Sequence, residues 1–536
     1  MMTRWIGLLL GLLLLALTGC KQDDFFAKNS VVYCVESSPQ GMNPQLYSAG
    51  SLGSALSQQI YDRLLTINPH TQRLEGALAS KWQMSRNGLT YTFTLRQGVR
   101  FHAVPWFTPT RTFNSADVLF SFSRLIDEQH PFHAVSGGRY PFFDNVNFKE
   151  QISSIRALNA QQIQFELKRP NATFLANLAS DYAVILSAEY GAQLLGSGHT
   201  EQIDTLAVGT GPFLQQEFRL DEFIRMHGNP HYWDVPPTLE RLLFDYTPKP
   251  TKRLAKLLTG ECQVMAYPAA SQLAFIRKQP NLLLDIENNL NTAFLAINTE
   301  RRPFNNPLVR QAIAMGINRD NLLNAVYYDT GEWANSLLPP ISWAHNPNLT
   351  EHDYDPAGAR TLLKAANLPA ELTMNLWIPA GAKPYNPDAL KTAQLIQADL
   401  AKIGIRVTFT QMRWPQMRTQ LREGRHDALL FGWSADTSDP DNFFRPLLSC
   451  GAISTQGYNF SRWCDHHFDD LLDQAAATPH LGSRIEAYQQ AQSLIRDQLP
   501  LIPLAHSLNI YAAWKNLHNL EQTPLGGLSF QRAFRD

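Results

Sequence analysis

Cysteine and histidine are the residues whose spacing first suggests chemistry. The run Cys464-Asp-His-His holds three residue types that can bind a metal ion. Adjacent histidines point to opposite sides of a strand and diverge on a helix, so we interpret the run as an exposed loop and expect no metal. The chain has five cysteines, and Cys20 ends the N-terminal apolar segment. The other four, Cys34, Cys262, Cys450 and Cys464, form an even set that suits an oxidising compartment.

Four cysteines allow three pairings. Cys450 and Cys464 are close in sequence and flank a loop rich in Gly, Ser and Asn, so they could pair with each other. Cys34 would then pair with Cys262 and tie two distant segments into one domain. The alternative is that all four are buried thiols.

Motifs of common catalytic and nucleotide-binding sites are missing from the sequence. No Gly-Lys dipeptide of a P-loop occurs, and there is no G-x-S-x-G, H-E-x-x-H or C-x-x-C motif. Gly209-Thr-Gly begins like a dinucleotide-binding loop, but Pro212 and Phe213 end the pattern, which favours a structural turn. We therefore expect a binding protein without a cofactor, and no enzyme.

The first twenty residues have the pattern of a bacterial export signal. Arg4 precedes a twelve-residue apolar run at 6–17. This run is too short to cross a bilayer, which takes about 20 residues. The ending Leu-Thr-Gly-Cys20 resembles a lipobox, so we expect residues 1–19 to be a lipoprotein signal peptide and residues 20–30 a tether. A lipid on Cys20 would attach the protein to a membrane without spanning it. The alternative is an ordinary signal peptide.

Composition narrows the possible partners. The chain has 536 residues, and 46 Lys and Arg against 47 Asp and Glu give a net charge of −1. Binding to nucleic acid needs an excess of positive charge on one face, so we expect no nucleic-acid partner. With 44% apolar and 17% charged residues the chain is not mainly disordered, and its length suits two to four domains.

Strand and helix patterns alternate along the chain and indicate an α/β fold. The dipeptide Asn87-Gly88 predicts a hairpin before an alternating strand, and Ser115 is a candidate helix N-cap. We expect strands at 31–35, 89–95, 293–298, 405–410 and 427–433, and helices at 52–65, 115–126, 306–317, 388–403 and 484–498.

Four segments resemble one known family, the extracellular solute-binding proteins of family 5, which are the large peptide-binding proteins of bacterial ABC importers. They are residues 78–102, 208–213, 294–319 and 432–444. Residues 34–46 resemble the dipeptide-binding branch. Residues 106–111, 257–262, Trp343 and 444–450 are similar to the branch that serves Sap-type peptide transporters, which is linked to resistance against antimicrobial peptides.

The resemblance implies a periplasmic-binding-protein-like fold of class II, large peptide-binding type, with two lobes, mixed sheets and a hinge. We expect lobe I at 31–288 plus 507–536, with a subdomain around 73–205, and lobe II at 289–506. Such lobes close on a ligand, and hinge residues absorb the motion.

The resemblance also implies the main ligand contacts. Asp436 stands where the family places the carboxylate that holds the α-amino group of a peptide, and a turn cap is the alternative. Trp433 could form an aromatic wall, or pack in the core. Lys383 stands where dipeptide binders carry an Arg for the ligand carboxylate. Because Lys lacks the bidentate fork of Arg, a peptide C-terminus would be held less tightly.

Further contacts follow from the same resemblance. Ser48 and Gly50 would offer backbone groups to the peptide, and the segment from Asn291 to 298 could pair with it as an added strand. Trp106 and Arg111 could also face the cleft.

The implied ligands are oligopeptides or antimicrobial peptides. The implied partners are the ABC permease subunits of the inner membrane, with the protein a monomer in the periplasm of a Gram-negative bacterium. The alternatives are a haem- or dipeptide-binding carrier of the same fold, with His102 or His133 as candidate haem ligands, and a secreted hydrolase.

Overall fold

The computed structural model describes residues 29–39, 41–47, 51–69, 71, 73–350, 352–368, 372–380, 383–453, 457–523 and 525–536. Cys20, Ser48 and Gly50 lie outside these residues, as does the expected signal peptide. Within the described residues, no helix has the length and apolar character needed to cross a membrane.

The first lobe is built on a seven-stranded mixed sheet, ordered β12-β19-β11-β1-β10-β9-β8. Its central strand β1 is buried along its whole length and runs parallel to β10 and β11. A strand that is covered on both faces needs an uninterrupted apolar run, and β1 has the sequence SVVYCV. The strands are β1 (Ser30–Val35), β8 (Phe213–Arg219), β9 (Phe223–Gly228), β10 (Arg241–Tyr246), β11 (Val264–Ala266), β12 (Leu282–Glu287) and β19 (Asn509–Trp514).

A four-stranded antiparallel sheet, ordered β4-β5-β7-β6, extends the first lobe. Its strands are β4 (Ala79–Met84), β5 (Thr90–Leu95), β6 (Ile152–Asn159) and β7 (Gln162–Leu167). The predicted hairpin is present, with Gly88 at φ +69° in the turn between β4 and β5. Alternate residues of β5 are buried, and Phe93 packs edge-on against Phe165 of β7.

Helix α3 (Ser115–Ile126) has the predicted bounds, but its N-cap is Asn114 rather than Ser115. The Asn114 side chain accepts from the Ala116 N–H, and Asp117 completes a capping box. The prediction of a helix at 52–65 is wrong at its end, because α2 (Ser51–Ile60) stops at Ile60 and the chain continues into β2 (Leu65–Ile67).

The second lobe is built on a six-stranded sheet, ordered β14-β18-β13-β17-β15-β16. On β13, Leu295 and Ile297 join the hydrophobic core beneath one layer of helices, whereas Phe294 and Ala296 join the core on the other face. Because successive side chains point to opposite faces and a core covers each face, β13 is apolar from Ala293 to Ile297. The strands are β13 (Asn291–Ile297), β14 (Gly331–Trp333), β15 (Leu372–Pro379), β16 (Ile405–Met412), β17 (Ala428–Ser434) and β18 (Leu501–Ser507).

Helices cover both faces of this sheet. The helices of the first layer are α10 (Pro307–Gly316), α12 (Pro356–Ala365) and α13 (Ala389–Ala401); those of the second are α14 (Trp414–Arg422), α15 (Asp441–Leu448), α16 (His466–Ala477) and α17 (Leu481–Gln498). The remaining helices are α4 (Pro141–Asn145), α5 (Phe148–Gln151), α6 (Phe174–Leu178), α7 (Ala188–Ser197), α8 (Pro250–Thr259), α9 (Leu273–Arg277) and α11 (Arg319–Leu322).

Short elements complete the part of the chain that the structure describes. They are η1 (Pro44–Leu46), η2 (Thr200–Asp204), η3 (Ala270–Gln272), η4 (Leu323–Tyr327), η5 (Cys450–Ile453), β3 (Leu74–Gly76), β20 (Leu517–His518), β21 (Glu521–Gln522), β22 (Leu528–Ser529) and β23 (Phe534–Arg535).

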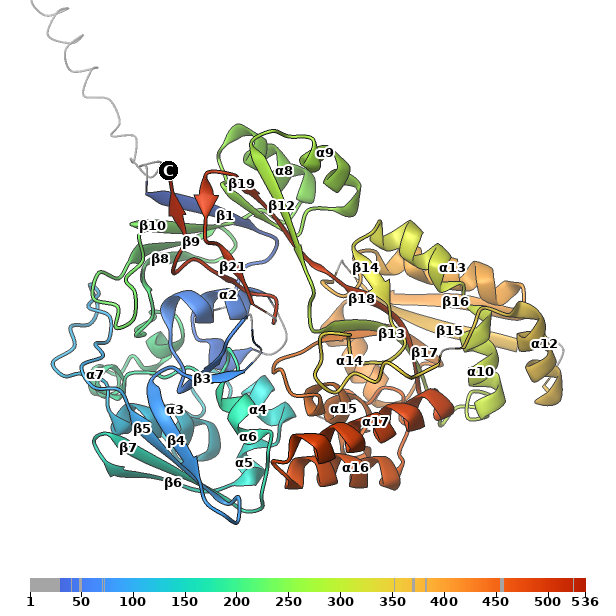
Figure 1. Cartoon of the computed structure of the whole chain (residues 1–536), viewed down its shortest axis with the longest axis horizontal. Coiled ribbons are helices and arrows are strands. Elements are labelled where there is room, and N and C mark those ends of the chain that lie inside the picture. The colour runs from blue at the N-terminus through green and yellow to red at the C-terminus, as the bar shows by residue number, and fades with distance from the viewer. Residues whose placement is uncertain are drawn as a thin grey trace, which may run out of the picture.

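Two strand pairs carry the chain from one lobe to the other. β12 of the first lobe is followed within four residues by β13 of the second, and β18 is separated from β19 by Leu508 alone. Figure 1 shows these strands as long ribbons that join the two lobes. The hinge is therefore formed by two short crossings.

The four described cysteines lie in two pairs at disulfide distance. Cys34 on β1 pairs with Cys262, and Cys450 pairs with Cys464. These are the two pairs expected if the neighbouring Cys450 and Cys464 bond to each other. The first joins strand β1 to the segment that leads into β11, and the second closes a short loop in the second lobe.

Candidate functional site

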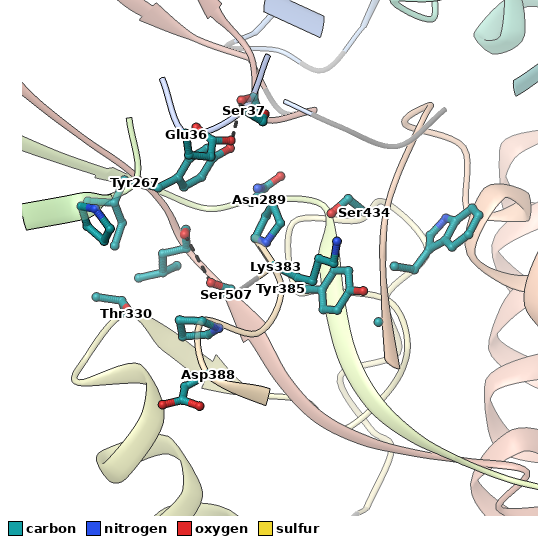
Figure 2. A pocket seen from close by; sticks show the side chains of 18 of the residues that line it. Glu36, Ser37, Tyr267, Asn289, Thr330, Lys383, Tyr385, Asp388, Ser434 and Ser507 are labelled. Atoms are coloured by element: carbon teal, nitrogen blue, oxygen red, sulfur yellow. Dashed lines mark hydrogen bonds between the residues drawn. The ribbon is translucent and has the colours of Figure 1, made fainter. Parts of the chain in front are cut away.

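A cavity of about 1100 Å³ lies between the two lobes. Figure 2 shows Glu36, Ser37 and Tyr267 on the side of the first lobe, and Lys383 and Ser434 on the side of the second. Other lining residues are Asn289 and Ser507 at the crossings, Asp181, Arg253, Asp388, Asp436, and the aromatic residues Tyr47, Tyr182, Tyr328, Tyr385, Trp414, Phe431, Trp433 and Tyr458.

Asp436 and Trp433, which the resemblance implied as ligand contacts, both line this cavity. Asp436 is only 2% exposed. The Asn442 side-chain oxygen accepts from the Asp436 backbone N–H at 2.8 Å and from the Trp433 indole N–H at 3.3 Å. Asn442 therefore holds the carboxylate segment and the indole ring in one arrangement before a ligand arrives, which lowers the ordering cost of binding.

Aromatic rings form the wall of the second lobe. Trp414 stacks on Phe431 with ring centroids 5.0 Å apart and planes 9° apart, and Trp433 meets Tyr458 edge-on at 5.2 Å. Gly432 lies between Phe431 and Trp433, and a Cβ there would come within 2.2 Å of the Tyr385 ring. The glycine thus permits Tyr385 to pack against β17. Such a wall suits apolar side chains and the faces of peptide groups.

Most charged side chains around the cavity have partners in the protein. Asp181 forms a buried ion pair with Arg63, and Asp388 caps α13 by accepting from the Lys391 N–H at 2.9 Å. Lys383 lies in a tight turn whose two backbone hydrogen bonds join it to residue 386, both at 3.0 Å. Within the described part of the chain, no carboxylate forms an ion pair with the Lys383 ammonium, so it can meet a negative group of a ligand.

Arg253 lies in the cavity wall contributed by the first lobe. Its guanidinium donates to the carbonyls of residues 247, 248, 266 and 267 at 2.8 to 3.1 Å. Burial lowers its pKa from the usual value. Because carbonyl groups already accept from its nitrogens, Arg253 holds the wall together and adds positive charge to it. No sequence motif marks this residue, because only the folded first lobe brings it to the cavity wall.

The structure contradicts the prediction for Asn291. Its side chain donates to the Ser507 carbonyl at 2.8 Å and accepts from the Ser507 N–H at 2.9 Å, so it fastens the two crossings to each other. The prediction that this segment accepts the ligand as an added strand is also wrong. β13 pairs with β17 on one side and β18 on the other, and a strand needs an unpaired edge to take another.

The loop with Trp106 and Arg111 does not line the cavity. Arg111 instead makes a two-fold contact with Asp117, with both N–O distances at 2.7 Å, and this supports the start of α3. The Trp106 carbonyl accepts from the Gln193 side chain. The loop at residues 106–111 is therefore bound to the first lobe, away from the cavity.

The two candidate haem ligands also lie away from the cavity. His102 is buried, and its Nε2 is 2.9 Å from the Gly211 carbonyl, while its Nδ1 accepts from the Gly209 N–H at 3.3 Å. Burial lowers its pKa to about 4. His133 contacts the Arg124 carbonyl at 2.7 Å. No histidine is among the described residues that line the cavity.

The run at Cys464 is not the expected exposed loop, because Asp465 caps α16 and both histidines lie in the first turn of that helix. The sulfur atoms of Cys450 and Cys464 and a ring nitrogen of His466 lie within 4.8 Å of one another. Because both sulfur atoms belong to the disulfide, they are not thiolate ligands in this structure.

Comparisons with known proteins agree with this architecture. Residues 73–455 match the model of the bacterial extracellular solute-binding proteins, family 5 Middle. The peptide transport periplasmic protein SapA of Salmonella typhimurium is 43% identical over 94% of this chain and 92% of its own length. Heme-binding protein A of Haemophilus influenzae is 38% identical over 93% of this chain and 91% of its own length.

A solved structure extends the comparison to the three-dimensional fold. The dipeptide-binding protein of Pseudoalteromonas sp. SM9913, in complex with Met-Leu, has a TM-score of 0.86 and 41% sequence identity, with 94% of this chain and 100% of that chain covered. The two-lobe class predicted from the sequence is confirmed. With its interlobe cavity and this extent of similarity, the chain belongs to the bacterial extracellular solute-binding proteins of family 5.

Proposed function

We propose that this protein is the peptide-binding component of an ABC transporter and encloses an oligopeptide between its lobes. The observation that carries the proposal is the composition of the cavity. It combines the buried Asp436 carboxylate, an aromatic wall and, separately, the Lys383 ammonium. A peptide has an ammonium at one end, a carboxylate at the other and apolar side chains between them. Relatives that are named as peptide transport or dipeptide-binding proteins support this ligand class.

Asp436 is the proposed acceptor for the α-amino group. A carboxylate shielded from water forms a stronger bond to an ammonium than an exposed one, because water no longer screens the charges. Asn442 fixes the backbone of Asp436, and Trp433 provides the adjoining wall. Recognition of the amino terminus would then be the strictest requirement on the ligand.

The proposed ligands are longer than two residues. The cavity of about 1100 Å³ exceeds the range of about 300–1,000 Å³ that is usual for pockets of small ligands. A dipeptide such as Met-Leu has about 17 non-hydrogen atoms and leaves much of that space to water. Lys383 offers one point charge without the geometry of a guanidinium, so it tolerates more than one position of the C-terminal carboxylate.

We also propose where the protein works and how it is divided. Lobe I at 31–288 plus 507–536 and lobe II at 289–506 would close about the crossings, and a monomer would present the closed form to the permease subunits in the inner membrane. The periplasmic setting of the Salmonella relative supports a periplasmic protein. We propose that a lipid on Cys20 attaches it to a membrane. Mass spectrometry of the mature N-terminus checks this, and an unmodified N-terminus beyond residue 20 would contradict it.

A titration series tests the proposed ligand class. Isothermal titration calorimetry is run with alanine peptides of two to six residues, each also prepared in N-acetylated and C-amidated form. We expect affinity to rise beyond the dipeptide, to collapse on acetylation and to fall modestly on amidation. If no member of the series binds, whereas haem binds with a shift of its Soret band, the peptide assignment is wrong and the haem alternative replaces it.

A further inference from the structure

A direct hydrogen bond joins the lobes far from the crossings. The backbone N–H of Ala172, in the first lobe, donates to the carbonyl of Ala476, in the second, at 2.8 Å. Figure 1 shows the region of α6 facing α16 at the edge of the molecule that lies away from the crossing strands. Neither residue lines the cavity. A rotation about the crossings would move this edge most, so opening of the lobes would break the bond.

The donor side of this contact is preformed. Asn171 is only 8% exposed, and its side-chain oxygen accepts from both the N–H and the hydroxyl of Thr173, each at 2.9 Å. Its amide group donates to Gln151 at 2.6 Å, and its carbonyl accepts from the Tyr91 hydroxyl at 3.3 Å. These bonds lie within the first lobe, so they fix the loop and aim the Ala172 N–H whether the lobes are open or closed.

The acceptor side is the end of a helix. The last four carbonyls of α16 have no partner within the helix, and Ala476 is among them. The neighbouring carbonyl of Ala475 accepts from Arg484 at 3.0 Å. Arg484 also donates to both oxygens of Asp439, at 2.7 and 3.0 Å. Asp439 follows the cavity residue Asp436 by three positions, so Arg484 connects the helix end with the segment that lines the cavity.

We propose that the Asn171–Ala172 loop is a closure latch, which caps α16 in the closed form and is released in the open form. Arg484 is a positioning residue, which fixes the C-terminal end of α16 relative to the segment that contains Asp436. The latch contact lies outside the cavity and acts on the equilibrium between open and closed forms. Its loss should therefore weaken all ligands by one common factor, of about 2- to 10-fold for a single hydrogen bond. The chemical class of the ligand rests on the proposed function, whereas the effect of the latch on the open and closed forms does not depend on which ligand binds.

The test measures the lobe-to-lobe distance in the ligand-free protein. Spin labels are placed at Leu158→Cys in the first lobe and Leu481→Cys in the second, which are 49% and 55% exposed. Ala172→Pro removes the donor N–H, whereas Ala172→Gly keeps it. We expect the Pro variant to shift the distance distribution toward the open form and the Gly variant to match the parent. Identical distributions for all three proteins would overturn the latch.

A second variant covers the case in which Ala172→Pro does not fold, as judged by its circular dichroism and melting curve. Asn171→Ala keeps every backbone donor but loosens the loop, and it should shift the distribution in the same direction by a smaller amount. A folded Asn171→Ala protein with the parent distribution would also overturn the proposal.

The role of Arg484 is tested by a double-mutant cycle. Arg484→Lys keeps the charge near Asp439 but cannot reach all of its present acceptors. If Arg484 supports the latch, Ala172→Pro has a smaller effect on the open-to-closed ratio in the Arg484→Lys background. Additive effects would remove Arg484 from the latch. Titration with the alanine peptides of two to six residues then separates the two proposals: a loss of affinity by one common factor supports the latch, and absence of any binding counts against the peptide ligand alone.

Discussion

Replacement of Asp436 by Asn gives the sharpest test of the ligand site. The change removes a negative charge and keeps the shape of the side chain. Asp436 is 2% exposed, so its bond to an ammonium would be shielded from water. A hydrogen bond to a charged group contributes about 1.5–3 kcal/mol, which corresponds to a loss of affinity of about 10- to 150-fold.

The assay compares peptides with a free amino terminus and their N-acetylated forms. Trp433 and Trp414 line the cavity, so their fluorescence should report binding directly. We expect Asp436→Asn to weaken free peptides by the factor above and acetylated peptides by about twofold at most. The ratio between the two series cancels any general effect of the substitution on closure or stability.

Asp388→Asn is the matched control. It removes the same charge from the same cavity, and Asn is as good an N-cap as Asp, so α13 keeps its start. The ratio between free and acetylated peptides should stay at the parent value in this variant. If Asp436→Asn weakens both series equally, Asp436 has a structural role and the proposed amino-terminal site is refuted.

Three further predictions concern stability and closure. Burial lowers the pKa of His102 to about 4, whereas the pKa in the unfolded chain is about 6.5. The unfolded chain therefore binds the proton more tightly, and the free energy of unfolding falls as the pH drops from 6.5 toward 4, by about 2 kcal/mol at pH 5. His102→Gln should therefore reduce the difference between urea midpoints at pH 7 and pH 5, and an unchanged difference would contradict this. Replacing Cys450 and Cys464 by Ser opens a link across 14 residues and should cost about 3 kcal/mol in urea unfolding; a loss below about 1 kcal/mol would argue against the loop-entropy account. Leu525 packs against a core of the second lobe and lines the cavity, so Leu525→Ala should speed ligand release in stopped-flow experiments, whereas Leu520→Ala, which packs on the first lobe, should lower the melting temperature only.

Local patterns predicted the regular elements well. The bounds of α3 and the alternating strand β5 follow from periodicity and from the turn at Gly88. The N-cap was assigned one residue late, because Ser115 and Asn114 are both good caps and only the reciprocal bond with Asp117 decides between them. The end of α2 was missed because its apolar spacing continues past Ile60, where the chain instead turns toward β2.

Contacts that depend on the assembled fold were harder to predict. Asp436 and Trp433 lie in one short motif, so their joint position in the cavity could be inferred from it. Asn291 looked available to a ligand because an apolar run does not reveal whether a strand is central or at an edge. Arg253 could not be inferred, since its place in the wall results from packing between segments that are distant in sequence.

The position of β19 has a consequence for how the protein is made. This strand lies between β11 and β12 in the seven-stranded sheet, yet it is formed by residues 509–514. The sheet therefore stays split until almost the whole polypeptide has been synthesised. A nascent chain that emerges N-terminus first therefore keeps the sheet of its first lobe incomplete until residues 509–514 have been added. Products that terminate early leave unpaired strand edges, which quality-control proteases can recognise.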